Sequence, residues 1–195
     1  MENRVVMLPL ADQSAARANP QLVKLLRKGR GRSRRFTWPR RLEVVETLVA
    51  EGLLPAIYFI FSRAGCDQAA STVAAAGLNL TTPEEAKTIR RRAEAATGHV
   101  GDSDLAVLGF SGWADHLERG VAAHHAGMVP AFKEAVEDLF VDGLLKVVFA
   151  TETLSLGLNM PARAVVLERL SKFVASARQS LVHTRTSATS RRTQL

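Results

Sequence analysis

The chain has 195 residues, of which 47% are hydrophobic, so it is long enough for one domain with a substantial core. We expect no transmembrane helix and no secretory signal, because no run of eighteen apolar residues occurs and the N-terminus lacks a basic region followed by an apolar one. The single cysteine, Cys66, permits neither an internal disulfide nor a cysteine zinc site. We therefore expect a cytoplasmic protein with no membrane partner and no metal site.

Charge is distributed unevenly along the chain, whose formal net charge is +7. Residues 1–41 contain eleven Lys or Arg and two acidic residues, and residues 174–195 contain four Arg and no acidic residue. Residues 42–173 hold more acidic than basic residues. The basic character therefore belongs to the two ends, and we do not expect a generally basic surface on the middle of the chain.

Residues 1–41 are predicted to form a basic arm or linker. Its densest part interleaves arginines with two aromatic residues: Arg30, Arg32, Arg34, Arg35, Phe36 and Trp38. Arginines neutralise phosphates and aromatic rings stack on bases, so this composition suits single-stranded nucleic acid. The alternative interpretation is a solvated basic segment, which is the usual role of a charge run.

Two helices and a strand are predicted next along the chain. Apolar residues recur at helical spacing in residues 41–51, and the apolar run at residues 56–61 indicates a strand. Ser62 follows this strand and is a suitable N-cap for an Ala-rich helix. Ser62 could cap this helix or contact a nucleic-acid phosphate. Arg63 could be an ordinary surface charge or could contact a phosphate.

Residues 78–119 are predicted to be a helical insertion. Thr82 and Glu85 have the spacing of a capping box, and Pro83 stands at the first helical position, so a helix is expected at residues 83–97. After a glycine-containing break, Asp102 can start another helix.

The rest of the chain predicts a parallel sheet. Short apolar runs at residues 121–123, 147–150 and 163–168 indicate strands, and a helix is predicted at residues 130–140 between the first two. The run at residues 147–150 is continuously apolar, as in a strand that is buried on both faces. This alternation predicts an α/β fold with a doubly wound, mainly parallel sheet.

Polar residues and glycines follow two of these strands. His124, His125 and Gly127 follow the first, and a loop that begins at Thr151 follows the second. Ligands of open α/β sheets bind at the carboxyl ends of the strands, so these two loops are candidates for a binding site. The alternative is that they are ordinary connections between strands and bind no ligand. Two histidines that are adjacent on a strand point in opposite directions, and no cluster of Cys or carboxylates joins them, so we do not interpret them as a metal site.

Three sequence blocks resemble motifs of superfamily 2 helicases, in the form found in the superkiller-type DExH-box RNA helicases. The blocks stand in the same order along the chain as in that family, and the residues that flank them resemble actinobacterial members. The block at residues 55–66, PAIYFIFSRAGC, resembles motif IV. The block at residues 149–163, FATETLSLGLNMPAR, resembles motif V, and HHAGMVP at residues 124–130 resembles the block between them. The resemblance implies a partial RecA-like helicase C-terminal domain over residues 42–173.

The resemblance also implies which residues would act. Residues that would hold the nucleic-acid backbone are Ser62, Arg63, His125, Gly127 and Thr151. Gly157 and Asn159 would face the nucleotide cleft and couple the ATP state to the grip on the strand. Glu152 would be structural or would communicate between the nucleotide cleft and the strand. The implied partners are single-stranded nucleic acid, with RNA favoured, and a first RecA-like domain.

The chain departs from the family pattern in three places. It has no P-loop sequence, no Asp-Glu pair to hold Mg²⁺, and no motif VI with its phosphate-stabilising arginines. ATP and Mg²⁺ are cofactors of the intact family enzyme, and we expect neither to bind tightly to this chain alone. No residue of the chain is predicted to be catalytic, and we expect the chain alone not to hydrolyse ATP.

The C-terminal segment, residues 174–195, is predicted to be a disordered tail. Twelve of its residues are Ser, Thr or Arg without periodicity, which is typical of disorder. Because the resemblance stops near Phe173, we expect a truncation or a shift of reading frame before motif VI.

Two functional classes are consistent with the sequence. The first is a fragment of an ATP-dependent RNA or DNA helicase, and the second is a non-enzymatic basic module that binds nucleic acid or another partner through the arm. An upstream reading frame with a P-loop, or a downstream frame that encodes motif VI, would favour the first.

If the arm binds nucleic acid, deletion of residues 24–41 should remove most of the affinity for single strands, whereas Thr151→Ala should cost less. Binding should fall steeply with salt and be nearly independent of base sequence, because phosphate neutralisation and stacking carry it. Fluorescence anisotropy with labelled oligonucleotides measures both variants. Unchanged affinity after the deletion would make the arm a linker only.

Overall fold

The computed structural model describes residues 19–21, 24, 39–151, 161–168, 171–174 and 177–180, the last two ranges as backbone only. The chain divides into two compact units, residues 1–53 and 54–195, and each is described by itself. In the first unit, helix α2 (Arg41–Ala50) confirms the helix predicted there. Its first turn is closed by the Arg40 main-chain N–H, which donates to the Glu43 carboxylate at 2.9 Å.

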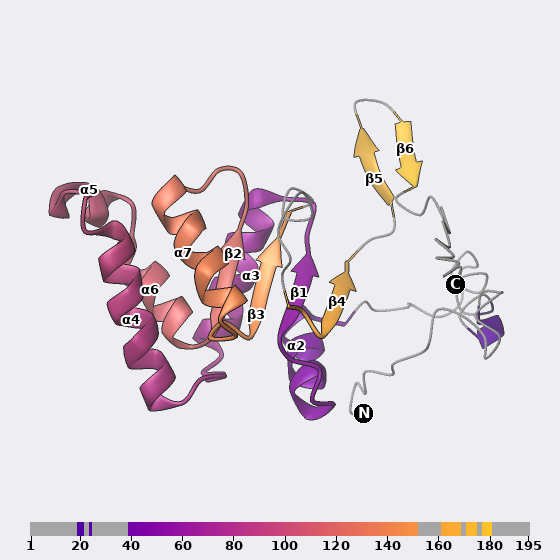
Figure 1. The fold of residues 1–195 in the computed structure, drawn as a ribbon. Coiled ribbons are helices and arrows are strands. Elements are labelled where there is room, and N and C mark those ends of the chain that lie inside the picture. Colours follow the sequence, from indigo (N-terminus) through magenta and orange to yellow (C-terminus); the bar gives the residue numbers. More distant parts are fainter. Residues whose placement is uncertain are drawn as a thin grey trace, which may run out of the picture. The chain divides into compact units, whose positions relative to one another are not determined.

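The second unit contains the helices and strands of the predicted α/β fold (Figure 1). They are, in chain order, β1 (Ala56–Phe59), α3 (Arg63–Ala75), α4 (Pro83–Thr97), α5 (Asp102–Val107), α6 (Phe110–Glu118), β2 (Val121–His124), α7 (Pro130–Val141), β3 (Val147–Ala150), β4 (Ala164–Leu167), β5 (Ser171–Val174) and β6 (Ala177–Ser180).

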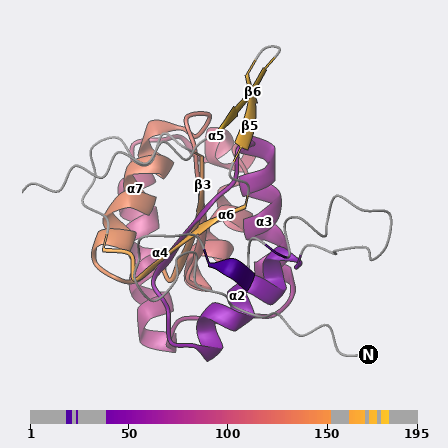
Figure 2. The same cartoon turned by 90° about the vertical axis from the view of Figure 1, so that its right-hand side faces the viewer.

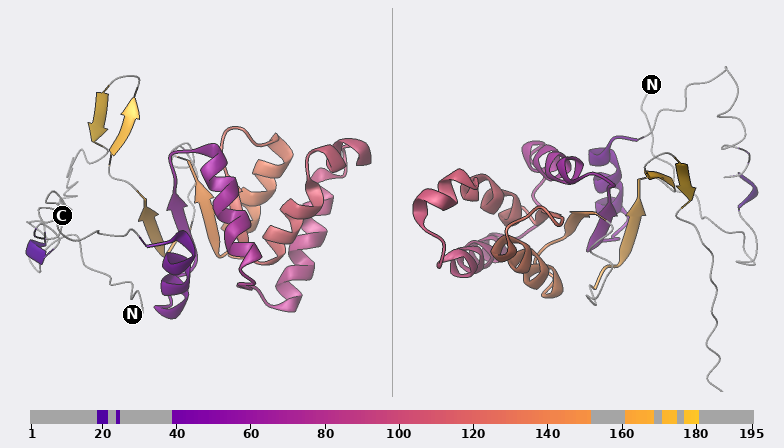
Figure 3. Two further views of the ribbon diagram at one scale, coloured as in Figure 1. Left: turned by 180° about the vertical axis from the view of Figure 1, so that it is seen from behind. Right: turned by 90° about the horizontal axis from the view of Figure 1, so that it is seen from above.

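Strands β1 to β4 form one parallel sheet in the order β2-β3-β1-β4, which confirms the predicted fold class. Ala150 of β3 is in register with His124 of β2 and with Phe59 of β1, so the three strands finish at the same level. Helices α3 and α7 lie on opposite faces of the sheet, with β3 between them (Figures 2 and 3). The sheet is therefore doubly wound, as the alternating pattern predicts.

Helices α4 and α6 share one core with the sheet. Ile89 of α4 and Leu117 of α6 are fully buried and belong to the same cluster as Val136 and Phe140 of α7 and Val148 of β3. The predicted helical insertion, residues 78–119, therefore contributes buried side chains to the core of this unit.

The start of α4 is fixed by the capping box expected from the sequence. The Thr82 hydroxyl accepts from the Glu85 N–H at 3.2 Å, and the Thr82 N–H donates to the Glu85 carboxylate at 2.8 Å. Lys146, just before β3, donates to the same carboxylate at 2.8 Å and holds the pKa of Glu85 below its usual range. The helix start is therefore tied to the start of the central strand, which the sequence pattern does not indicate.

Five residues of the predicted disordered tail lie in strands, namely Val174 at the end of β5 and residues 177–180. Residues 177–180, which composition assigns to a disordered tail, form β6 and pair antiparallel with β5. Strand pairing uses main-chain groups, whereas the expectation of disorder rests on side-chain composition. The rest of the segment from residue 181 lies outside the described residues.

Strand β4 is an edge of the sheet with an apolar exposed side. Val165 is 58% exposed and Leu167 is 46% exposed, while Ala164 and Val166 are half-buried. Among the described residues, no helix is long and apolar enough to cross a membrane.

The shared core predicts the effect of a cavity in α4. Ile89→Ala should lower the free energy of unfolding by about 2–5 kcal/mol, because a fully buried aliphatic side chain is lost from the cluster. Val107→Ala, at a position that is 87% exposed, should change it by less than about 0.5 kcal/mol. Urea unfolding followed by circular dichroism measures both, and equal stabilities for the two variants would contradict the shared core.

Candidate nucleic-acid interface

The strand ends bring most of the described candidate residues to one edge of the sheet. Ser62 follows β1, His125 follows β2, and Thr151 follows β3, which lies between the other two strands. The Thr151 N–H donates to the His124 carbonyl at 3.2 Å, which joins the ends of β3 and β2 directly. The sequence analysis expects each of these segments to follow a strand, and the parallel sheet brings the three strand ends to one edge.

Ser62 is the N-cap of α3. Its side-chain oxygen accepts from the Gly65 N–H at 3.1 Å, so the capping interpretation is confirmed. A side chain at position 65 would meet Ile60 at 3.0 Å and Ser62 at 3.2 Å, which explains why glycine suits this turn. The Ser62 residue is exposed and its hydroxyl hydrogen can still be donated to a phosphate, so capping and binding are compatible.

His125 shapes the loop that contains Gly127. Its Nε2 lies 2.9 Å from the Asp67 carboxylate of α3, and its Nδ1 accepts from the Gly127 N–H at 3.1 Å. Both ring nitrogens are therefore engaged, and the geometry favours a positioning role for His125 over a direct contact to a phosphate.

Arg63 lies beside Gly127 on this edge. A Cβ added to Gly127 would lie 3.3 Å from the Arg63 Cδ and 3.5 Å from its Nη1, so glycine is what permits their close approach. Arg63 is exposed at the first position of α3. An exposed guanidinium beside a glycine loop can bind a phosphate oxygen without reading a base.

His124 makes a contact that the sequence analysis missed. It is 1% exposed, and its Nε2 lies 2.7 Å from the Glu137 carboxylate of α7. Burial lowers the pKa of His124, and Glu137 opposes this effect only in part. Because His124 reaches α7 and His125 reaches α3, the two histidines point to opposite faces of the sheet, as expected for neighbours on a strand.

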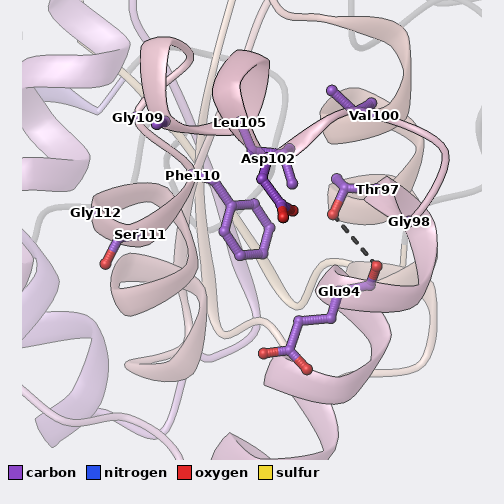
Figure 4. A pocket seen from close by; sticks show the side chains of 11 residues that line it. Glu94, Thr97, Gly98, Val100, Asp102, Leu105, Gly109, Phe110, Ser111 and Gly112 are labelled. Carbon is purple, nitrogen blue, oxygen red and sulfur yellow. Dashed lines mark hydrogen bonds between the residues drawn. The ribbon is translucent and has the colours of Figure 1, made fainter.

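Two cavities open beside α6. The larger, of about 660 Å³, lies among α4, α5 and α6, with Phe110 and Leu105 on its apolar side and Glu94 and Asp102 among its polar residues (Figure 4). The smaller, of about 430 Å³, lies between α3, α6 and the loop after β2 and includes His125 and Gly127 in its lining. Composition and spacing indicate neither cavity.

Some candidate residues lie outside the described residues. They are Glu152, Gly157 and Asn159 of the predicted nucleotide cleft, and Arg30, Arg32, Arg34, Arg35, Phe36 and Trp38 of the basic arm. Within the described ranges, no group of three or more His, Cys, Asp or Glu could hold a metal ion.

Comparison with known proteins finds helicases. No protein-family model matches the chain. The chain is 57% identical over 147 residues to the probable helicase HelY of Mycobacterium tuberculosis, which is 75% of this chain and 16% of that protein. It is 53% identical over 166 residues to the probable helicase HelY of Mycobacterium leprae, 84% of this chain and 18% of the relative.

A more distant relative is also a protein of the superkiller type. The chain is 38% identical over 141 residues to the human superkiller complex protein 2, which is 72% of this chain and 11% of that protein. The chain therefore spans less than a fifth of the length of each of these relatives.

The burial of His124 predicts a loss of stability in acid. The folded protein holds His124 neutral, whereas an unfolded histidine gains a proton as the pH falls below about 6.5. The free energy of unfolding should therefore decrease from pH 7.5 to 5.5, with a slope of up to about 1.4 kcal/mol per pH unit for each such group.

His124→Gln should reduce this pH dependence, although His116, whose pKa burial also lowers, should leave part of it. Urea unfolding at a series of pH values provides the measurement. A His124→Gln profile that is parallel to the wild-type profile would contradict this account.

Proposed function

Because the chain belongs to the superkiller-type DExH-box helicase family, we propose that it forms part of the second RecA-like domain of an ATP-dependent helicase. In this proposal, the edge at the ends of β1, β2 and β3 holds the backbone of one nucleic-acid strand, with RNA favoured. The observation that carries it is the convergence of Ser62, Arg63, Gly127 and Thr151 on that edge.

The chemistry of these groups supports a backbone contact. Arg63 supplies a positive charge, Ser62 supplies a hydroxyl, and the loop at Gly127 approaches Arg63 closely. Such groups position a phosphodiester chain without distinguishing bases. A helicase needs this kind of contact because it must move along any sequence.

The segment that follows β3 would connect the strand to the nucleotide. Thr151 begins it, next to the His124 carbonyl, and Glu152, Gly157 and Asn159 follow in the sequence. We assign these three residues to one wall of the ATP cleft, where they would couple the state of the nucleotide to the grip on the strand. ATP and Mg²⁺ would be held together with the first RecA-like domain, and this chain alone would supply no catalytic residue.

The proposal predicts that Arg63→Ala weakens binding of single-stranded RNA by the 195-residue chain. Affinity should fall by a similar factor for different base sequences, and the salt dependence should drop by about 0.7 in the slope of log affinity against log salt, because one phosphate contact is lost. Fluorescence anisotropy between 50 and 200 mM salt would measure both effects.

Arg91→Ala is the matched control, since Arg91 is also an exposed arginine in a helix but lies on α4. It should leave affinity and slope close to those of the wild type. The proposed contact is wrong if the two variants bind alike.

A further inference from the structure

The smaller cavity lies beside the candidate interface. It has a volume of about 430 Å³ and is walled by α3, α6 and the segment between β2 and α7. Its lining includes Asp67 and Ser71 of α3, Trp113 and His116 of α6, and His125 and Gly127 of the loop. Two of these, His125 and Gly127, also belong to the edge described above, so the cavity opens next to the proposed path of the strand.

The charge of the lining disfavours a phosphate and favours a neutral ligand. None of the described residues that line the cavity is Lys or Arg. The one carboxylate among them, that of Asp67, is bonded to His125. Most of the remaining wall is apolar and includes Leu108, Met128 and Phe132. A flat, uncharged heterocycle suits such a wall better than an anion does.

Polar groups in the lining can recognise the edge of a heterocycle. The Trp113 ring stacks on Phe132 with centroids 4.2 Å apart, and its Nε1 is buried without a hydrogen-bond partner among the described residues. Ser71 and His116 are further polar residues of this lining. Burial lowers the pKa of His116, so its imidazole is neutral and can both donate and accept.

Arg63 and Gly127 connect this cavity to a phosphate site. Gly127 lines the cavity and lies against the Arg63 side chain, and Arg63 stands four residues before Asp67 on α3. Residues four apart are neighbours on a helix surface, so Arg63 lies next to Asp67, which lines the cavity.

We propose that the cavity between α3, α6 and the loop after β2 binds one nucleobase of the strand whose phosphate is held at Arg63. The inference rests on the proposed function and adds a base subsite to it. Such a subsite would let the domain grip each nucleotide at two points while it remains tolerant of sequence, because every base has an apolar face and a polar edge.

Two serines provide a matched pair of variants. Ser71 lines the proposed base cavity and Ser111 lines the larger cavity, and both are exposed residues in helices. Ser71→Leu should fill the base cavity, whereas Ser111→Leu makes the same chemical change elsewhere. Trp113→Phe is a second test. It keeps an aromatic ring in the wall of the cavity but replaces the indole by a smaller ring without an N–H.

The experiment measures the affinity of the 195-residue chain and its variants for an oligouridine RNA and for the same backbone without bases. Wild type should prefer the RNA with bases, and Ser71→Leu should reduce that preference by about tenfold, as expected for loss of one base contact. Affinity for the abasic strand should not change, and Ser111→Leu should behave as wild type. Circular dichroism melting verifies that each variant is folded.

The outcomes separate this inference from the proposed function. If strands bind through Arg63 but Ser71→Leu and Trp113→Phe both keep the full preference for bases, the base subsite is wrong and the backbone contact stands. If Arg63→Ala binds as wild type, or if no strand binds at all, the proposed function fails and the subsite fails with it.

Discussion

The parallel hydrogen-bonded ladder that joins β2, β3 and β1 is the constraint on which the candidate interface depends. It aligns His124, Ala150 and Phe59 at one level, so the segments after three different strands leave the sheet at the same edge. The ladder is covered by α3 on one face and α7 on the other, and its central strand is fully buried. Polar groups from distant parts of the sequence therefore meet at one edge of the sheet.

The two histidines at the end of β2, His124 and His125, connect this edge to both helical layers. His124 bonds to Glu137 of α7, and His125 bonds to Asp67 of α3. The end of β2 is thus held from both faces, and the Thr151 N–H is bonded to it through the His124 carbonyl. This arrangement gives the adjacent histidines a structural purpose that needs no metal, and it pre-orients the loop with Gly127.

Helices α4 and α6 contribute both stability and shape. They bury Ile89 and Leu117 in the main core, and the Glu85–Lys146 pair ties α4 to the start of β3. The same helices leave two cavities beside α6, one of which adjoins the strand-end edge. The segment that the sequence predicts to be a helical insertion therefore supplies part of the wall of the proposed binding site.

The sequence by itself determined the parallel α/β class, the order of most helices and strands from α2 to β4, and the strand ends that polar residues follow. It indicated one helix where α5 and α6 stand, and it did not indicate β5 and β6. Hydrophobic periodicity and the Thr82–Glu85 capping box involve residues that are close in the sequence, so they can be recognised without knowing how the chain packs. Only the tertiary structure decided the partners of His124 and His125, which are 13 and 58 residues away, the inclusion of α4 in the core, and the cavity lined by Ser71 and Trp113. These features depend on contacts between elements that are remote in sequence, and neither composition nor spacing records such contacts.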